Sequence, residues 1–387
     1  MYNKSMRAAF VVQRYGKEVI GGAEKLARDY AERLFIRGWD ITVYTTTALD
    51  YITWANHYSV GESILHGVRI KRYPVEKERN IDEFNHFSEE FFSEERNREE
   101  EEYWLELQGP VSPQLVEAIS REYKDYDLVI FFTYLYYPTY YGLKEVGKSA
   151  ILFPTAHDEP PFHMGIMREV FTIPCTLLFL SEEEKELVDR YYPAENRREV
   201  IGAGIEPPSQ FFTKLFLDRF LLYPPFILYM GRIDEGKGCN QMLECFIPYA
   251  NYRPSLFALA GKLNMELPAD PRIRYLGYLP ERVKWDAIKA STLTVHPSSL
   301  ESFSYFLLES LSVGVPGIVN EKSPVLKGHI ERSNAGLTYK DCPSFASALE
   351  LLLTEPELYN YMGEQGRKYV RENFSWEVVL SRLSSVL

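Results

Sequence analysis

The chain has 387 residues, of which 45% are hydrophobic and 25% charged, and its formal net charge at pH 7 is −12. This length and composition indicate a globular protein with two domains of ordinary size, each able to bury its own core. The acidic balance argues against nucleic acid as the main partner, because binding to a phosphate backbone needs a basic surface, and it weakens contact with anionic lipid without excluding it.

Cysteine usage and apolar runs bear on where the protein works. The four cysteines are Cys175, Cys239, Cys245 and Cys342. They show neither a CxxC pair nor a metal-ligand spacing, so we expect reduced packing residues and no disulfide framework. Residues 1–5 lead into a strand without the apolar segment that a signal peptide needs, and the longest apolar run, 128–141, is shorter than a membrane crossing. We therefore expect a cytoplasmic protein without a transmembrane helix.

The first half alternates expected strands and helices. Apolar runs at 6–13 and 41–46 have strand length, and small and apolar residues recur at helical spacing over 23–34 between them. A strand, a helix and a strand in succession form a βαβ unit, which begins a parallel sheet. The loop before the helix carries Gly21 and Gly22, which would let a backbone approach a ligand, although ordinary turn geometry explains two glycines at least as well.

A segment rich in acids and aromatics interrupts this alternation from about 80 to 108. Phenylalanines recur there at helical spacing beside runs of glutamate, which indicates an amphipathic helix or a helical pair. We expect the acids to form a solvated face. The other interpretation is an insertion beside the ligand site, in which Tyr103 and Trp104 stack on a sugar or cover a lipid tail.

Polar residues flank the later strands of this half. Asp125 and Asp127 form a D-x-D pattern, but they precede the expected strand 128–133, whereas ligands gather at the carboxyl ends of parallel strands. We therefore reject a metal site there. His157 follows the strand 150–154 and so lies at the carboxyl edge, where a polar side chain can face a ligand, although a lone histidine is more often structural than functional. The segment 200–208, rich in Gly and Pro, is typical of a linker between domains.

The second half restarts the alternation with a strand at 226–230, followed by further strands at 256–261, 273–276 and 293–295 and a helix at about 282–290. Arg232 and Lys237 lie in the glycine-bearing loop after the first of these strands. Such cations can hold a diphosphate, Arg through forked hydrogen bonds and Lys as a point charge. The alternative to a diphosphate site is that this loop is an ordinary polar turn at the surface.

Residues 298–309 predict a crossing from strand to helix, with the helix starting near Ser302. A helix start offers unpaired N–H groups and a partial positive charge, which suit a phosphate. Glu301 precedes this start and Glu309 lies about two turns inside, a separation of roughly 12 Å along the helix. This spacing fits a sugar-diphosphate-ribose ligand. Two simpler explanations stand beside it: a glutamate near a helix start complements the helix dipole, and Glu309 is a solvated surface acid.

In this order, the motifs resemble the retaining glycosyltransferases of the family-4 type, which have the GT-B fold. The matching motifs are I-G-G-A-E-K at 20–25, H-D at 157–158, V-I-G-A-G-I-E at 200–206, L-Y-M-G-R-I-D-E-G-K-G at 228–238, R-Y-L-G-Y-L at 274–279 and P-S-S-L-E-S-F-S-Y-F-L-L-E-S-L-S-V-G-V-P at 297–316. The resemblance implies two Rossmann-like α/β domains facing each other across a cleft. These would be an acceptor-side domain at 1–205, a nucleotide-sugar domain at 206–372 and a C-terminal helix at 373–387 that packs back on the first domain.

The resemblance also implies roles for the matching residues. The catalytic group would be Arg232, Lys237, Glu301 and His157. The donor-binding group would be Gly21, Gly22, Gly231, Tyr278, Leu279, Phe303, Ser304, Tyr305 and Glu309. The cations and the backbone N–H groups would neutralise the departing diphosphate, the glutamates and the histidine would bind ribose and hexose, and the backbone of the 278–279 pair would frame the base. The family often has glycine at position 304, so the serine puts the fine donor geometry in doubt.

We therefore expect transfer of a hexose from a nucleotide sugar (UDP-hexose with UDP-glucose favoured, or GDP-mannose) to a saccharide or lipid-linked saccharide, with retention of the anomeric configuration. No metal or other cofactor is expected, because protein cations would stabilise the leaving group. A nucleotide-sugar 2-epimerase of the same fold and a non-catalytic nucleotide-sugar-binding protein remain alternatives. A nicotinamide oxidoreductase is disfavoured because the G-x-G-x-x-G fingerprint is absent. We expect a role in polysaccharide or glycoconjugate biosynthesis, with peripheral contact at the inner face of the membrane left open.

Overall fold

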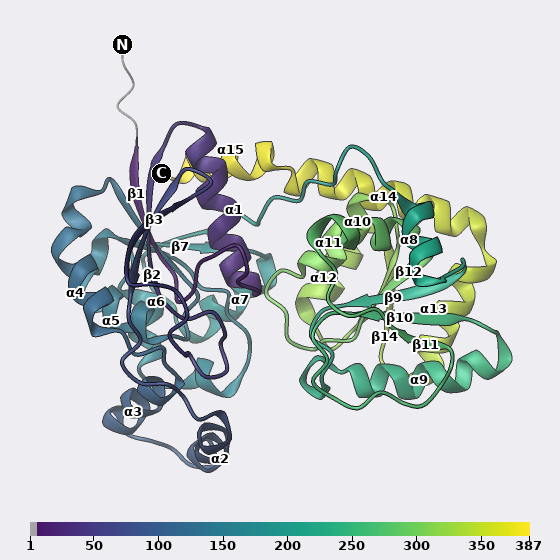
Figure 1. Ribbon diagram of the computed structural model, residues 1–387, viewed down its shortest axis with the longest axis horizontal. Helices are drawn as coiled ribbons and strands as arrows, with labels where there is room; N and C mark the ends of the chain where they lie inside the picture. Colours follow the sequence, from purple (N-terminus) through teal and green to yellow (C-terminus); the bar gives the residue numbers. More distant parts are fainter. Residues whose placement is uncertain (1–5) are drawn as a thin grey trace. The chain divides into compact units, whose positions relative to one another are not determined.

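A computed structural model describes residues 6–387, and the expectation for residues 1–5 lies outside this range. The chain divides into two compact α/β units, the first ending at Ile201 and the second spanning Gly202–Leu387 (Figure 1). The division falls within the expected linker at 200–208, four residues before the predicted boundary at 205. Residues 373–387 belong to the second unit, and their packing on the first stays a prediction.

The first unit is built on an eight-stranded sheet in the order β3-β4-β2-β1-β5-β6-β7-β8. Its strands are β1 (Arg7–Val11), β2 (Asp40–Thr46), β3 (Gly61–Leu65), β4 (Val68–Tyr73), β5 (Leu128–Phe132), β6 (Ala150–Phe153), β7 (Thr176–Phe179) and β8 (Arg197–Val200). Its helices are α1 (Gly22–Ile36), α2 (Ile81–Phe91), α3 (Arg98–Gln108), α4 (Pro113–Glu122), α5 (Tyr137–Val146), α6 (Met167–Thr172) and α7 (Glu182–Tyr191). Neighbouring strands are parallel apart from the β3–β4 hairpin. The central strands are almost wholly buried, which is why their sequences read as continuous apolar runs.

The second unit is built on a six-stranded parallel sheet in the order β11-β10-β9-β12-β13-β14. Its strands are β9 (Phe226–Met230), β10 (Leu256–Ala260), β11 (Ile273–Tyr275), β12 (Leu293–His296), β13 (Gly317–Asn320) and β14 (Gly336–Tyr339). Its helices are α8 (Thr213–Phe220), α9 (Cys239–Tyr252), α10 (Glu281–Ala290), α11 (Tyr305–Ser312), α12 (Pro324–Ser333), α13 (Cys342–Thr354), α14 (Pro356–Phe374) and α15 (Trp376–Val386). Helices α9 and α13 pack together below the sheet in Figure 1, and α10, α11 and α12 lie above it. The predicted α/β class with two parallel-sheet units is confirmed.

The strand order of the second unit determines which loops can meet. Strands β9 and β12 are hydrogen-bonded neighbours although more than sixty residues separate them in the sequence. Because carboxyl ends of parallel strands lie at one edge, the loops that follow these two strands emerge side by side. These loops carry Arg232 and Lys237 in one case and Glu301 in the other.

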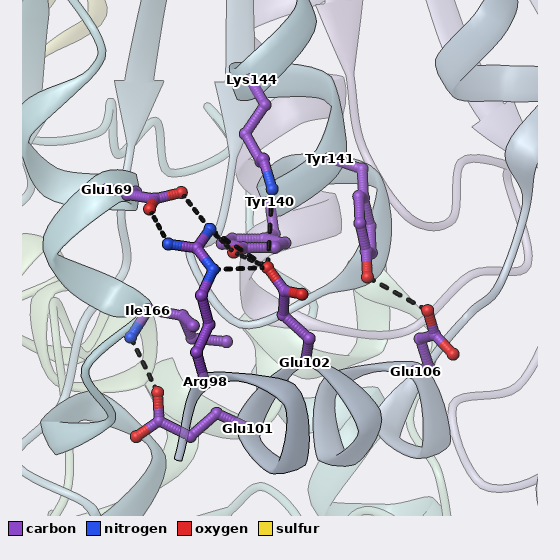
Figure 2. Close-up of polar contacts among 9 residues, drawn as sticks. All are labelled: Arg98, Glu101, Glu102, Glu106, Tyr140, Tyr141, Lys144, Ile166 and Glu169. Atoms are coloured by element: carbon purple, nitrogen blue, oxygen red, sulfur yellow. Dashed lines mark hydrogen bonds and ion pairs between the residues drawn. The ribbon is translucent and has the colours of Figure 1, made fainter.

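The acidic segment of the first unit forms the two helices α2 and α3, and its acids do not all face solvent. The carboxylate of Glu101 is buried and accepts the N–H groups of Gly165 at 2.7 Å and Ile166 at 2.9 Å. Figure 2 shows the contact with Ile166. Arg98 bridges Glu102 of its own helix and Glu169 of α6. The prediction of a solvated acidic face is therefore wrong for Glu101, whose carboxylate fastens α3 to the start of α6.

Trp104 is not available to stack on a sugar or cover a lipid tail. Its side chain is only 2% exposed, and its indole Nε1–H donates to Ser88 Oγ at 3.0 Å. It packs among Phe84, Phe91 and Phe92, so it holds α2 against α3. The suggested ligand contact through Trp104 is wrong, whereas the neighbouring Tyr103 is about half exposed.

A disulfide joins two cysteines that we expected to be reduced. Cys245 of α9 and Cys342, the first residue of α13, are bonded, with Cα atoms 4.7 Å apart. They are 97 positions apart and meet because α9 and α13 pack against each other, which the cysteine spacing could not reveal. Cys175 and Cys239 are free thiols.

Within residues 6–387, no helix combines the length and apolar character needed to cross a bilayer.

Removing this disulfide is expected to destabilise the second unit. A cross-link restricts the unfolded chain, and a disulfide typically contributes about 2–4 kcal/mol to the free energy of unfolding. Cys342→Ser should therefore lower the urea midpoint measured by circular dichroism under non-reducing conditions, and added reductant should lower that of the wild type to match. Cys175→Ser, which removes an exposed free thiol, is the control and should leave the midpoint unchanged. Equal midpoints for wild type and Cys342→Ser would contradict the prediction.

Candidate functional site

The two loops at the carboxyl edge of β9 and β12 pack closely against each other. The first ends at Gly238, where φ is +74° and an added Cβ would lie 2.8 Å from the carbonyl oxygen of Pro297 in the second loop. Only glycine tolerates both the backbone conformation and this approach. Asp234 stabilises the first loop, because its carboxylate accepts the N–H of Lys237 at 2.8 Å. The residues 232–237 and 297–301 are therefore held together as one surface.

Lys237 is the cation at the centre of this surface. Its Nζ lies 2.8 Å from Glu301 Oε1 and 3.3 Å from Ser298 Oγ. Both the lysine and the glutamate side chains keep some exposure to solvent, so a ligand can reach the ammonium group. The pair thus presents a positive charge of fixed position together with a carboxylate that can accept hydroxyl hydrogen bonds.

Arg232 lies in the same loop but reaches outward. Its side chain is 47% exposed, and its Nη1 lies 3.5 Å from the carboxylate of Asp234. Its backbone is anchored, because the hydroxyl of Tyr229 donates to its carbonyl at 2.6 Å. Gly231, with φ at +156°, makes the turn between strand and loop. The backbone is therefore fixed while the guanidinium group is presented at the surface.

The helix after β12 begins later than predicted. Residues 302 and 303 form a bend, Ser304 adopts a left-handed conformation with φ at +62°, and α11 starts at Tyr305 rather than near Ser302. Glu309 is consequently about one turn inside the helix and not two. Glycine adopts a left-handed backbone conformation at lower free-energy cost than other residues do. This explains why the family-4 glycosyltransferases that the chain resembles often have glycine at this position.

Glu309 is buried, so it is not a solvated surface acid. Its Oε1 lies 2.6 Å from Nζ of Lys284 on α10, and the same ammonium group lies 2.8 Å from Glu281 Oε1. Burial alone would lower the pKa of Lys284, but the carboxylates of Glu309 and Glu281 raise it above its ordinary value. Lys284 was not predicted from the sequence, because its only signal there is a lysine on a helix and the pairing depends on how α10 packs on α11.

The loop after β11 supplies the remaining candidates of the second unit. Tyr278 is exposed and Leu279 is buried. The N–H of Gly261 donates to the carbonyl of Gly277 at 2.9 Å, which ties the loops after β10 and β11 together. The backbone of 277–279 thus lies at the same carboxyl edge as the loops that follow β9 and β12.

The other candidates lie in the first unit, at the carboxyl edge of its sheet. Gly21 and Gly22 form the start of α1, and a Cβ added at Gly22 would meet no atom within 4 Å, so the backbone there is open to an approaching group. Beside this loop Arg14 and Glu24 form a buried ion pair, which was not predicted from the sequence. The guanidinium of Arg14 also donates to the carbonyl of Ile20 at 3.1 Å, and so fixes the loop that leads to the helix.

His157 follows β6 and is partly exposed, with Nδ1 3.6 Å from Glu159 Oε1. The loop that carries it is anchored by Glu184, a fully buried residue in the first turn of α7. One carboxylate oxygen of Glu184 accepts the N–H of Ala156 at 2.7 Å and the other accepts the N–H of Leu180 at 2.8 Å. Burial raises the pKa of Glu184 to about 7 in spite of these backbone hydrogen bonds.

This raised pKa predicts a pH-dependent contribution to stability. In the folded protein Glu184 keeps a proton between its ordinary pKa of 4.5 and about 7, whereas the unfolded chain releases it. The contribution to the free energy of unfolding is therefore fully present below the ordinary pKa and is lost as pH rises through 7. Glu184→Gln cannot ionise, so the difference in unfolding free energy between wild type and variant should change by about 2–3 kcal/mol between pH 5 and 8.

Urea unfolding of both proteins at several pH values measures this difference. Glu182→Gln removes an exposed carboxylate of the same helical turn and should leave the pH dependence unchanged. If the free energies of unfolding of wild type and Glu184→Gln changed with pH in parallel, the Glu184 carboxyl would titrate normally and the prediction would be contradicted.

Comparison with known proteins places a family match within the second unit. Residues 220–369 match the model of the family described as Glycosyl transferases group 1. The chain is 22% identical over 253 residues to the capsular polysaccharide biosynthesis glycosyltransferase CapM of Staphylococcus aureus; the match covers 58% of this chain and 64% of CapM, just under two thirds of that relative's length.

Solved structures resemble the whole chain. The sucrose-phosphate synthase of Thermosynechococcus elongatus has a TM-score of 0.74 at 16% identity, covering 98% of each chain. Anabaena Alr3699/HepE, solved in complex with UDP-glucose, has a TM-score of 0.72 at 12% identity, covering 98% of this chain and 99% of the other. These likenesses show that the chain has the GT-B fold.

Proposed function

We propose that this GT-B chain, whose second unit carries a Glycosyl transferases group 1 domain, moves a hexose from a nucleotide sugar to a saccharide or lipid-linked saccharide with retention of anomeric configuration. The observation that carries the proposal is the surface made by the loops after β9 and β12. There an ammonium group, a carboxylate and a helix start lie at one edge of a parallel sheet. Ligands of such sheets bind at this edge.

In the proposed reaction the acceptor hydroxyl oxygen bonds to the anomeric carbon on the face that the diphosphate leaves, while the bond between the sugar and the diphosphate breaks. Negative charge develops on the departing diphosphate, which takes up the proton of the acceptor hydroxyl. Lys237 and Arg232 neutralise that charge, together with backbone N–H groups at 303–305 and near Gly22. Cations and dipoles that are already in position need no reorganisation as the charge develops, so they stabilise the transition state efficiently. Because protein groups supply this charge, the proposed mechanism needs no metal ion.

The two glutamates divide the recognition of the donor. Glu309 accepts hydrogen bonds from the ribose hydroxyls, and Glu301 accepts them from the hexose, with His157 as a further partner of the sugar. The burial of Glu309 supports its role, because a buried carboxylate held by Lys284 presents its acceptor atoms in a fixed geometry. The backbone of Tyr278 and Leu279 frames the base.

UDP-glucose is the favoured donor, with other UDP-hexoses and GDP-mannose as the next candidates. The solved complex of HepE with UDP-glucose supports UDP, and the name of CapM supports a role in polysaccharide biosynthesis. We further propose that the two units close on the donor, with residues 373–387 packing back on the first unit, and that the protein works in the cytoplasm, with or without peripheral contact with the membrane.

A thermal-shift panel with UDP, GDP, ADP and their sugars tests the donor site. A ligand that binds only the native state stabilises it by about 2.7 kcal/mol at a hundred times its dissociation constant. We expect UDP and UDP-glucose to raise the melting temperature in the presence of EDTA. The absence of any shift with every nucleotide would refute the donor site.

Product analysis tests the reaction itself. With UDP-glucose and an added saccharide acceptor, we expect a new glycoside whose anomeric configuration, read by NMR, matches that of the donor. Formation of an epimeric nucleotide sugar without acceptor would instead establish a 2-epimerase, and binding without turnover would indicate a non-catalytic protein.

A further inference from the structure

The turn before α11 contains one peptide group whose direction decides what the candidate site presents to an anion. It joins Phe303 to Ser304, which has the left-handed conformation described above. In a planar trans peptide the carbonyl and the following N–H point in opposite directions. If the Phe303 carbonyl points into the protein, the Ser304 N–H points outward, and a flipped peptide would present the carbonyl oxygen instead.

His329 fixes the direction of this carbonyl. It lies on α12 and is completely buried, with Nε2 3.1 Å from the carbonyl oxygen of Phe303 and Nδ1 3.0 Å from the hydroxyl of Tyr369 on α14. A carbonyl oxygen can only accept, so the proton must be on Nε2. Nδ1 of the neutral ring then accepts from the tyrosine hydroxyl. The partners therefore select one tautomer and one ring orientation.

The surroundings keep the imidazole neutral and in place. Burial, with Arg332 nearby, lowers the pKa of His329 to about 3, so the ring does not charge at working pH. The ring of Phe374 packs against both the imidazole and Phe303, at centroid distances of 5.6 and 5.5 Å. Rotation of the histidine away from the Phe303 carbonyl would disturb this aromatic packing.

We infer that His329 is a positioning residue for the donor diphosphate: by holding the Phe303 carbonyl inward, it keeps the Ser304 N–H turned away from α12 and available to an anion. The inference rests on the proposed function, because it assigns that N–H to the departing diphosphate. Without the histidine donor, the peptide can flip and direct a carbonyl oxygen at the diphosphate, which repels it. His329 itself touches neither substrate nor the reacting atoms.

Two substitutions separate the hydrogen bond from the packing. His329→Leu fills the space but donates nothing, whereas His329→Gln keeps an amide N–H at about the reach of Nε2. We expect His329→Leu to weaken binding of UDP and to lower kcat for donor turnover by roughly 10- to 100-fold, less than the loss of a donor that touches the transition state. His329→Gln should recover most of both.

Tyr369→Phe is the matched control, because it removes the other hydrogen bond of the same imidazole and leaves the Nε2 contact and the ring packing. It should bind UDP and turn over the donor nearly as the wild type does. Equal losses in Tyr369→Phe and His329→Leu would show that the hydrogen bond to the Phe303 carbonyl is not what sustains UDP binding and turnover. No recovery in His329→Gln would show that the packing of the imidazole matters rather than its hydrogen bond. Either result would overturn the inference.

NMR of the wild-type protein labelled with ¹⁵N-histidine tests the hydrogen bond without activity. The resonances of His329, assigned by their loss in His329→Gln, should report the Nε2–H tautomer without titration between pH 5 and 8. The Nδ1–H tautomer, or titration near neutral pH, would overturn the inference. If wild type binds none of the nucleoside diphosphates, the proposed function fails, whereas equal UDP binding by wild type and His329→Leu defeats the positioning role alone.

Discussion

Lys237→Ala is expected to lower kcat/KM for the nucleotide-sugar donor by roughly 10²- to 10³-fold, which corresponds to about 2.7–4 kcal/mol of transition-state stabilisation. The ammonium group is held at a fixed position by Glu301 and Ser298, so its charge is in place before the diphosphate departs. Its removal also leaves the carboxylate of Glu301 beside the developing negative charge. We therefore expect kcat to fall more than KM rises, because the lost interaction is strongest in the transition state.

Steady-state kinetics of donor hydrolysis and of transfer measure this effect. Lys327→Ala is the control: Lys327 also faces a glutamate, Glu331 at 3.7 Å, but both side chains are about half exposed or more on the surface of α12. That variant should behave as the wild type does. Should Lys237→Ala keep its kcat and change only KM, the lysine would serve binding and the proposed leaving-group role would be wrong.

The second large effect is expected at the buried pair of Glu309 and Lys284. Removing one partner of a buried ion pair leaves an uncompensated charge and typically costs 3–5 kcal/mol. We expect Glu309→Leu to lower the free energy of unfolding by about 3 kcal/mol, the lower end of that range, because Glu281 still pairs with the lysine. The same variant should lose measurable UDP binding, since the ribose loses its acceptor.

A double-mutant cycle separates these two consequences. Lys284→Met combined with Glu309→Leu replaces the buried pair with apolar groups and should recover most of the lost unfolding free energy, measured by urea denaturation. UDP binding, measured by calorimetry, should stay lost in the double variant. If binding returned with stability, Glu309 would act through the fold of α11 and not through contact with ribose.

Several features of the candidate site could be predicted from short stretches of sequence. The cations at 232 and 237 follow an apolar strand, and the glutamates at 301 and 309 flank a helix start; both patterns are local, because they depend on strand ends and helical periodicity. The predicted helix start near Ser302 was wrong by three residues, because Ser304 adopts a left-handed conformation and α11 begins only after it. The sequence has no glycine at this position that would have indicated such a turn.

Other features depend on residues far apart in the chain. Lys284, Glu184 and His329 read as ordinary helix residues, and their importance comes from the partners that packing brings to them. The same holds for Glu101, which looked like one acid in a solvated run but whose carboxylate accepts backbone N–H groups some sixty positions away. Buried polar groups need partners, yet nothing in the linear sequence says which partner the fold will supply.

The sequence by itself determined the alternation of strands and helices, the parallel-sheet class and the loops that carry the candidate donor site, because each rests on periodicity and turn chemistry within a few residues. Only the tertiary structure decided the order of the strands, the bond between Cys245 and Cys342, and which carboxylates are buried against which cations. These features arise when whole helices and strands pack, and the free energy of that packing depends on surfaces that distant segments share.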